Sequence, residues 1–196
     1  LDIETYSPHG FPQAENPDHE VVIVSMTDNF GFERILRLEN DAATPRGDED
    51  VYGDEAALLR GLEMWIQRID PDVIEWHNGF IFDAPYILTR AEMHGVTLGL
   101  GRNSKPARTW TSQKKFAERD VAYLNTLVAG RSCIDTMFLA QAYDVYARAL
   151  PNYTLKGVAD FFRQEDGVTY AEMYGRDRSY VQGDQIARYW RENPDE

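Results

Sequence analysis

The stretch Trp76-His77-Asn78-Gly79-Phe80-Ile81-Phe82-Asp83-Ala84-Pro85-Tyr86 decides the fold class, because one element ends in it and another begins. The preceding Val73-Ile74-Glu75-Trp76 is a short apolar run typical of a buried strand. Asp83 and Pro85 are typical of a helix start, where aspartate caps free N–H groups and proline fits the first turn. Open α/β sheets bind ligands beyond the carboxyl ends of their strands, so Asp83 is a candidate site residue as well as a helix cap.

Strands and helices alternate along the rest of the chain. A β-branched run at 21–26 and an alternating run at 32–38 predict a hairpin. Residues 39–53 are rich in Asn, Asp, Pro and Gly and predict a loop, and apolar residues at helical spacing from Asp54 predict a helix ending before Pro71. A strand is expected at 132–135, followed by helices at about 137–148, 154–163 and 184–192. This order predicts an α/β domain with a mixed sheet.

Composition restricts the classes of protein. With 196 residues, 43% of them hydrophobic, we expect a single domain over 1–196. No apolar run is long enough for a membrane span and no secretion signal is present, so we expect a cytoplasmic protein without a membrane partner. The lone Cys133 suits a reducing compartment. The chain opens inside an apparent strand and stops abruptly, and we expect it to be a piece of a longer protein, truncated at both ends.

A pair of acids lies at the start of the chain. Asp-x-Glu occurs by chance about once or twice in a chain with 33 acids, and a second match exists at 18–20. Only Asp2-Ile3-Glu4 lies in an apolar strand, where period-2 alternation places both carboxylates on one face. Two carboxylates on one face repel each other unless they are solvated or bridged by a cation. The pair is therefore either a solvated strand edge or a ligand set for a hard cation such as Mg²⁺ or Mn²⁺.

The net charge of −13 argues against nucleic acid only weakly, because bound cations supply local positive charge that a sum over residues omits. Between Glu92 and Glu118 there is no acid, and this stretch holds Trp110, Lys114 and Lys115. It is either a solvated surface loop or an exposed hairpin that contacts the phosphates of a single strand.

These motifs together resemble the 3′-to-5′ proofreading exonuclease domain of family B DNA polymerases, in the RNase H-like DEDD superfamily. Asp2-Ile3-Glu4-Thr5 resembles the first exonuclease motif, and 78–86 resembles the second, Asn-x-x-x-Phe-Asp-x-Pro-Tyr. The Asp-Pro-Asp-Val-Ile entry at 70–74 and the later segment 153–159 extend the resemblance over nearly the whole chain. The implied fold is an RNase H-like mixed β-sheet with helices on both faces.

The resemblance implies a two-metal-ion hydrolase of the 3′ end of single-stranded DNA, active in proofreading or DNA repair and attached to a polymerase domain or subunit. Asp2, Glu4 and Asp83 would be catalytic and would hold two Mg²⁺ or Mn²⁺ ions. The residues expected to contact substrate are Thr5, Asn78, Phe82, Trp110, Lys114 and Lys115, although Phe82 suits core packing equally well. In a prokaryote the protein would be associated with the nucleoid.

The family's fourth carboxylate comes from a helical Tyr-x-x-x-Asp motif. Tyr180 and Asp184 have this spacing, but Gly183 just before a helical pattern predicts a loop there. We therefore expect the fourth ligand beyond Glu196 rather than at Asp184. Asp135 is a further acid, which matches no catalytic position of the family and is expected to start a helix.

Two alternatives stay open. The same carboxylate set serves enzymes that act on RNA, and nothing in the sequence reads a 2′-hydroxyl group. A non-catalytic nucleic-acid-binding module of a polymerase would also keep the fold, although it would not need the intact Asp2, Glu4 and Asp83.

Overall fold

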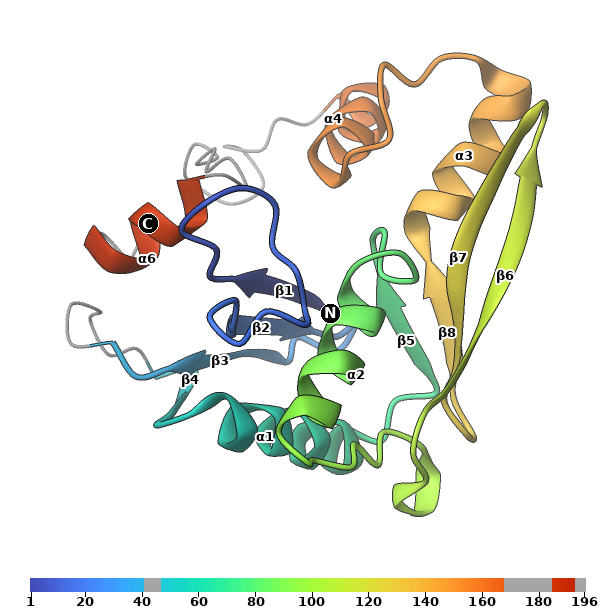
Figure 1. Ribbon diagram of the computed structural model, residues 1–196. Helices are drawn as coiled ribbons and strands as arrows, with labels where there is room; N and C mark the ends of the chain where they lie inside the picture. Colours follow the sequence, from blue (N-terminus) through green and yellow to red (C-terminus); the bar gives the residue numbers. More distant parts are fainter. Residues whose placement is uncertain (41–46, 168–184, 193–196) are drawn as a thin grey trace.

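The computed structural model describes residues 1–40, 47–167 and 185–192 (Figure 1). The strands are β1 (Asp2–Thr5), β2 (Val21–Thr27), β3 (Glu33–Leu38), β4 (Glu49–Tyr52), β5 (Val73–Trp76), β6 (Arg108–Phe116), β7 (Arg119–Leu127) and β8 (Ser132–Asp135). The helices are α1 (Glu55–Ile69), α2 (Asp83–Met93), the 3₁₀ turn η1 (Arg102–Ser104), α3 (Thr136–Ala147), α4 (Leu155–Asp166) and α6 (Ile186–Glu192). No helix in the described part of the chain is long and apolar enough to cross a membrane.

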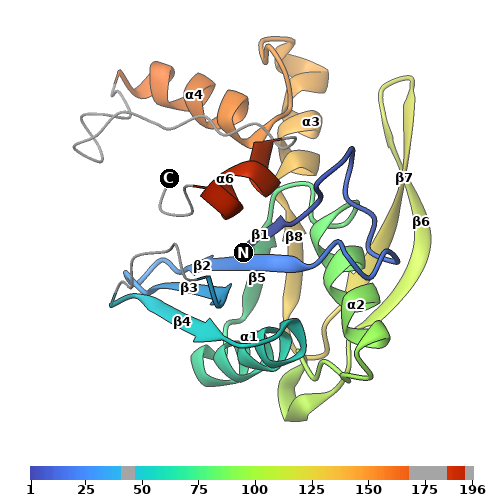
Figure 2. The same ribbon diagram turned by 60° about the vertical axis from the view of Figure 1, so that its left-hand side comes forward.

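The described strands form three sheets: the four-stranded β1–β2–β3–β4, which is mixed, and the two-stranded β5–β8 and β6–β7. β1, β2 and β3 pair antiparallel, β4 pairs parallel with β3, and β5 pairs parallel with β8. The terminal ammonium of Leu1 donates to the carbonyl of Glu75 at 2.8 Å, which places β5 beside the start of β1. Figure 2 shows α1 on one side of this arrangement and α6 on the other. The mixed α/β sheet with helices on both faces agrees with the sequence prediction.

Helix α1 forms where its apolar spacing predicts it. The Asp54 side chain accepts from the N–H of Ala57 at 2.7 Å, and the helix ends in a left-handed residue, Asp70, just before Pro71. Its apolar face, which includes Leu58 and Leu62, is fully buried, and the helix lies against β2, β3 and β4.

The loop predicted over 39–53 is wrong at its end, because residues 49–52 form β4. This strand pairs with β3, and Glu49 makes a 2.8 Å ion pair with Arg37 whose two side chains are almost inaccessible to solvent. Glu49, an acid inside the predicted loop, thus has a partner in the sheet. The hairpin predicted at 21–38 is confirmed as β2–β3.

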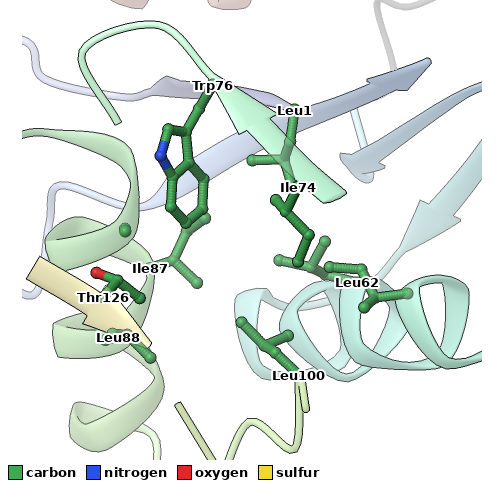
Figure 3. Close-up of a pocket in the computed structure, with 10 residues that line it drawn as sticks. Leu1, Leu62, Ile74, Trp76, Ile87, Leu88, Leu100 and Thr126 are labelled. Carbon is green, nitrogen blue, oxygen red and sulfur yellow. The ribbon is translucent and has the colours of Figure 1, made fainter. Parts of the chain in front are cut away.

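The core meets at the junction of β5 with α1 and α2. Figure 3 shows Leu1, Leu62, Ile74, Trp76 and Ile87 converging there around a void of only about 10 Å³. Trp76 also closes on the next turn, because a Cβ atom added at Gly79 would lie 2.1 Å from the Trp76 Cγ atom. The packing of β5 therefore constrains the loop that follows it.

A buried ion pair fixes the connection between β1 and β2. The Glu55 carboxylate, 1% exposed, accepts from Arg90 Nη2 at 2.5 Å and from the backbone of Val21 at 2.7 Å. Arg90 also donates to the carbonyls of Ala14 and Asn16, at 3.2 and 2.6 Å. The pair is thus satisfied on both sides, and it joins α1 and α2 to the loop that follows the first motif.

We expect Gly79→Ala to lower the free energy of unfolding by at least about 2 kcal/mol, because the new methyl group would overlap the buried Trp76 ring. Urea denaturation measures this change. Gly53→Ala is the matched control, because a Cβ atom at this exposed position meets nothing within 4 Å. Equal stability of the two variants would contradict the close packing of Trp76 on the turn.

Candidate active site

Asp2 and Glu4 lie on β1 with the buried Ile3 between them. Asp2 is an exposed residue. The protein around its carboxylate nevertheless removes hydration from it and raises its pKa, and this effect outweighs the terminal ammonium nearby, which lowers the pKa. The β1–β2 pairing shifts register between Glu4 and Thr5. Thr5, expected to contact substrate, is 5% exposed.

Asp83 is brought to β1 from a position 80 residues along the chain. Its Oδ1 atom accepts from the backbone N–H of Ile3 at 3.2 Å, and the residue is 2% exposed. Helix α2 begins at Asp83 as predicted, but Phe82 occupies the N-cap position, where it makes no side-chain hydrogen bond to the helix. The expectation that Asp83 is the cap is therefore wrong, and its carboxylate is directed to β1 instead.

The three carboxylates act on one another electrostatically. Burial raises the pKa of Asp83 to about 7, and the negative charge of Asp2 adds to the shift. Burial likewise raises the pKa of Glu4 to about 7, with further increases from Asp2 and Asp83 and a decrease from Lys156 on α4. Lys156 carries no motif that would single it out, and its cationic effect on Glu4 depends on where the fold places α4.

The donor set fits a hard divalent cation, because carboxylates that resist ionisation beside one another are relieved by a bound positive charge. Within residues 1–40, 47–167 and 185–192, no group of three or more His, Cys, Asp or Glu side chains is close enough to hold an ion as it stands. Tyr180 and Asp184 lie outside the described residues, so the fourth ligand stays a prediction.

The loop before Asp83 is held by an acid that sequence reasoning did not connect with it. Asp135 is 3% exposed and accepts from the backbones of Asn78 and Phe80, at 2.9 and 3.1 Å. It also accepts from Met137 as the cap of α3, which confirms its predicted place at a helix start. Asn78, with φ of 68°, occupies the left-handed region that asparagine tolerates.

His77 and Phe82 lie at the two ends of this loop. The His77 ring nitrogens are 2.9 Å from Thr136 Oγ1 and 2.8 Å from the carbonyl oxygen of Tyr153, so the ring is fixed between the start of α3 and the segment before α4. Phe82 is half-buried, with its ring 5.6 Å from that of Phe11, which is 76% exposed. Phe82 thus contacts the exposed ring of Phe11 on one side and the ring of Tyr86 on another.

The basic stretch runs into a hairpin of two nine-residue strands, β6 and β7, so the hairpin that one of its two interpretations predicted is present. Trp110 is 46% exposed, and the Lys114 ammonium lies 5.5 Å from the centre of the Phe138 ring on α3. Lys115 points to the other face, opposite Asp120 on β7. The structure therefore separates two lysines that the sequence placed together.

Comparison with known proteins agrees with this geometry. The family described as DNA polymerase family B, exonuclease domain, matches residues 1–158. A DNA polymerase of Pyrococcus horikoshii is 31% identical over 97% of this chain, and DNA polymerase 1 of Pyrococcus abyssi is 29% identical over the same share. The chain spans 13% and 21% of the lengths of these two relatives.

A solved structure shows the same fold. The family B DNA polymerase of the archaeon Pyrobaculum calidifontis matches with a TM-score of 0.64 at 25% identity, covering 96% of this chain and 20% of that one. The fold is accordingly RNase H-like, as the resemblance implied.

The raised pKa values predict how stability depends on pH without metal. Asp83 has an ordinary pKa of 3.8 and a folded value of about 7, so between these values the folded chain holds a proton that the unfolded chain releases. Stability is then greatest below about pH 4 and falls as pH rises towards 7. We expect Asp83→Asn to reduce this fall, measured as the thermal midpoint between pH 4.5 and 8 in EDTA.

The exposed Asp120→Asn is the control, and it should leave the slope as in the native chain. Magnesium added at pH 8 should raise the midpoint of the native chain more than that of Asp83→Asn, since a bound cation relieves the same repulsion. Parallel pH profiles for all three proteins would contradict the shift assigned to Asp83.

Proposed function

Because the chain belongs to the exonuclease domains of DNA polymerase family B, we propose that it removes nucleotides from the 3′ end of single-stranded DNA by phosphodiester hydrolysis. The observation that carries the proposal is the hydrogen bond from the Ile3 N–H to the Asp83 carboxylate. This bond brings the acid of the second motif next to the strand that carries the two acids of the first motif. As in the polymerases that it resembles, the domain would act beside a polymerase domain or subunit and correct its errors.

Asp2, Glu4 and Asp83 are the residues that would hold two Mg²⁺ or Mn²⁺ ions. Such ions, when bound, activate water and stabilise the leaving oxygen of a phosphodiester. With pKa values near 7, Glu4 and Asp83 are partly protonated at neutral pH, and ion binding would displace those protons. Lys156 adds a positive charge that favours the ionised form of Glu4.

The substrate strand would reach these acids across the loop that precedes Asp83. Asn78 would contact it at the left-handed turn, and Phe82 together with the exposed Phe11 would offer aromatic faces for a base. The hairpin would contribute Trp110 and Lys114 on one face. Because Thr5 is buried, it would hold β1 in position and would offer little surface to DNA.

We expect Asp2→Ala and Asp83→Ala each to reduce Mg²⁺-dependent degradation of single-stranded DNA more than about 100-fold, since the loss of outer-shell partners alone costs up to that much. A 5′-labelled oligonucleotide resolved on a gel measures the rate and shows whether products shorten from the 3′ end. The assay uses the complete protein, so that every ligand is present.

Asp18→Ala is the matched control, because Asp18 begins the second Asp-x-Glu of the sequence but lies exposed in the loop after β1. Its rate should equal that of the native protein. Unchanged rates in Asp2→Ala and Asp83→Ala would exclude these acids as ligands, and an RNA oligonucleotide degraded faster than DNA would favour the exoribonuclease alternative.

The two faces of the hairpin give a further test. We expect Lys114→Glu to weaken oligonucleotide binding and to flatten its salt dependence, because Lys114 shares a face with Trp110. Lys115→Glu should have the smaller effect, since Lys115 faces Asp120 on the other side. Fluorescence anisotropy at several salt concentrations measures the affinity and its salt dependence for both variants. Equal effects of the two substitutions would show that the oligonucleotide does not prefer the hairpin face that carries Trp110.

A further inference from the structure

The loop of residues 6–20 connects β1 with β2 and brings the ring centre of Phe11 to 5.6 Å from that of Phe82. The two ends of the loop are joined by a hydrogen bond of 2.8 Å from the Tyr6 N–H to the Glu20 carbonyl. Phe11 is 76% exposed, so burial of its own ring does little to hold it in place. The position of Phe11 therefore depends on the contacts that order the rest of the loop.

His19 makes such contacts on both sides of Phe11, and it is 8% exposed. Its Nδ1 atom accepts from the backbone N–H of Gln13 at 3.0 Å. Its Nε2 atom lies 3.5 Å from Ser7 Oγ, and this hydroxyl donates to the carbonyl of Gly10 at 3.0 Å. The imidazole ring thus holds the backbone shortly after Phe11 and, through Ser7, directly before it.

These contacts require a neutral His19 ring. A backbone N–H group can only donate, so Nδ1 must be the bare nitrogen and the single ring proton lies on Nε2. Ser7 Oγ accepts that proton, and the Asn16 side chain, 3.2 Å from Nε2, presents its own oxygen when its amide group rotates. A ring with protons on both nitrogens would lose the bond from Gln13 and set two N–H groups against each other.

The loop itself supplies no counter-charge for a protonated ring. Asp18 and Glu20 flank His19 in the chain, and Asp18 is exposed. In the part of the chain that the structure describes, neither carboxylate pairs with the His19 ring, whose nitrogens face the groups named above. A second proton on this ring would therefore be a buried charge without a partner in the loop.

The helices packed against the loop do not supply the missing charge either. Glu55 of α1 is engaged by Arg90 Nη2 and by His94 Nε2, at 2.5 and 2.7 Å. Tyr86 of α2 donates its hydroxyl proton to the carbonyl of His19 at 2.8 Å. Arg90 brings positive charge to the same loop, because it also donates to the carbonyls of Ala14, Asn16 and Pro17. The surroundings thus favour the neutral ring.

We propose that His19 is a positioning residue of the nuclease, whose neutral ring holds Phe11 beside Phe82 for a base of the substrate strand. A second proton on the ring releases the loop. The inference rests on the proposed function, which places a base at these two aromatic rings. Histidine is the side chain that changes its charge between pH 8 and pH 5. The strand should therefore bind less tightly as the pH falls through this range.

The test compares the native protein with His19→Asn, because the asparagine oxygen can take the place of Nδ1 and accept from Gln13 without ever gaining a charge. Mg²⁺-dependent degradation of 5′-labelled oligo(dT) by the complete protein gives kcat and KM at pH 8 and at pH 5.5. Between these values KM of the native protein should rise about threefold to tenfold more than KM of His19→Asn, the effect of one lost hydrogen bond. The change in kcat should be the same in both, because both carry the same carboxylates.

His9→Asn is the matched control, because His9 lies exposed in the same loop. It should keep the native dependence of KM on pH. His19→Phe fills the volume of the ring but offers no acceptor to Gln13, so its KM should be high at both pH values.

Phe11→Ala separates positioning from general stability. In this background, His19→Asn should no longer alter the dependence of KM on pH, because the effect of His19 passes through Phe11. A loss of overall stability at low pH would persist without Phe11. If His19→Asn does not fold, the native protein is compared with Phe11→Ala alone, whose KM should rise less as the pH falls.

The ring proton gives a second measurement, which needs no variant. In the native protein labelled with ¹⁵N-histidine, NMR correlation of ring nitrogens with ring hydrogens should show the His19 proton on Nε2 at pH 8. A proton on Nδ1, or on both nitrogens, at this pH would overturn the inference.

An equal dependence of KM on pH in the native protein and in His19→Asn would also overturn the inference, and it would leave the exonuclease proposal intact. If the native protein does not degrade oligo(dT) at either pH, the proposed function itself fails, and with it the role of His19.

Discussion

The hydrogen bond from the backbone of Ile3 to the Asp83 carboxylate is the contact on which the rest of the site depends. It joins the first strand to the start of α2 and thereby places three acids within electrostatic reach of one another. The consequence is visible in Glu4 and Asp83, whose pKa values both rise to about 7. The domain thus keeps three mutually repelling carboxylates close together, an arrangement that packing alone would not favour.

Buried acids also organise the loops around the site. Asp135 holds the turn at Asn78 by two backbone N–H groups, and Glu55 with Arg90 holds the loop after β1. Each acid is satisfied by several donors, which is the condition under which burial of a charge is tolerated. The irregular segments near the carboxylates are therefore fixed by polar anchors in addition to apolar contacts such as that of Trp76 with Gly79.

Much of this arrangement could be predicted from the sequence, because it depends on local patterns. Apolar spacing located α1, and the strand-to-helix stretch located Asp83 beside β5. The strand β4 was missed because its pairing with β3 and the Arg37–Glu49 contact join segments that local pattern does not relate. The role of Asp135 in the turn and the nearness of Lys156 to Glu4 escaped for the same reason: both depend on tertiary placement.

The anchoring of the turn by Asp135 has a consequence for how variation in this family is interpreted. A survey that ranks positions by lost activity would place Asp135 among the acids of the reaction, although its oxygens are occupied by backbone groups of the chain itself. Its loss would misplace Asn78 and unsettle the approach to Asp83 while leaving every ligand in the sequence. Measurements of metal affinity and of fold stability would separate such a scaffold acid from the ligands, where activity alone would merge them.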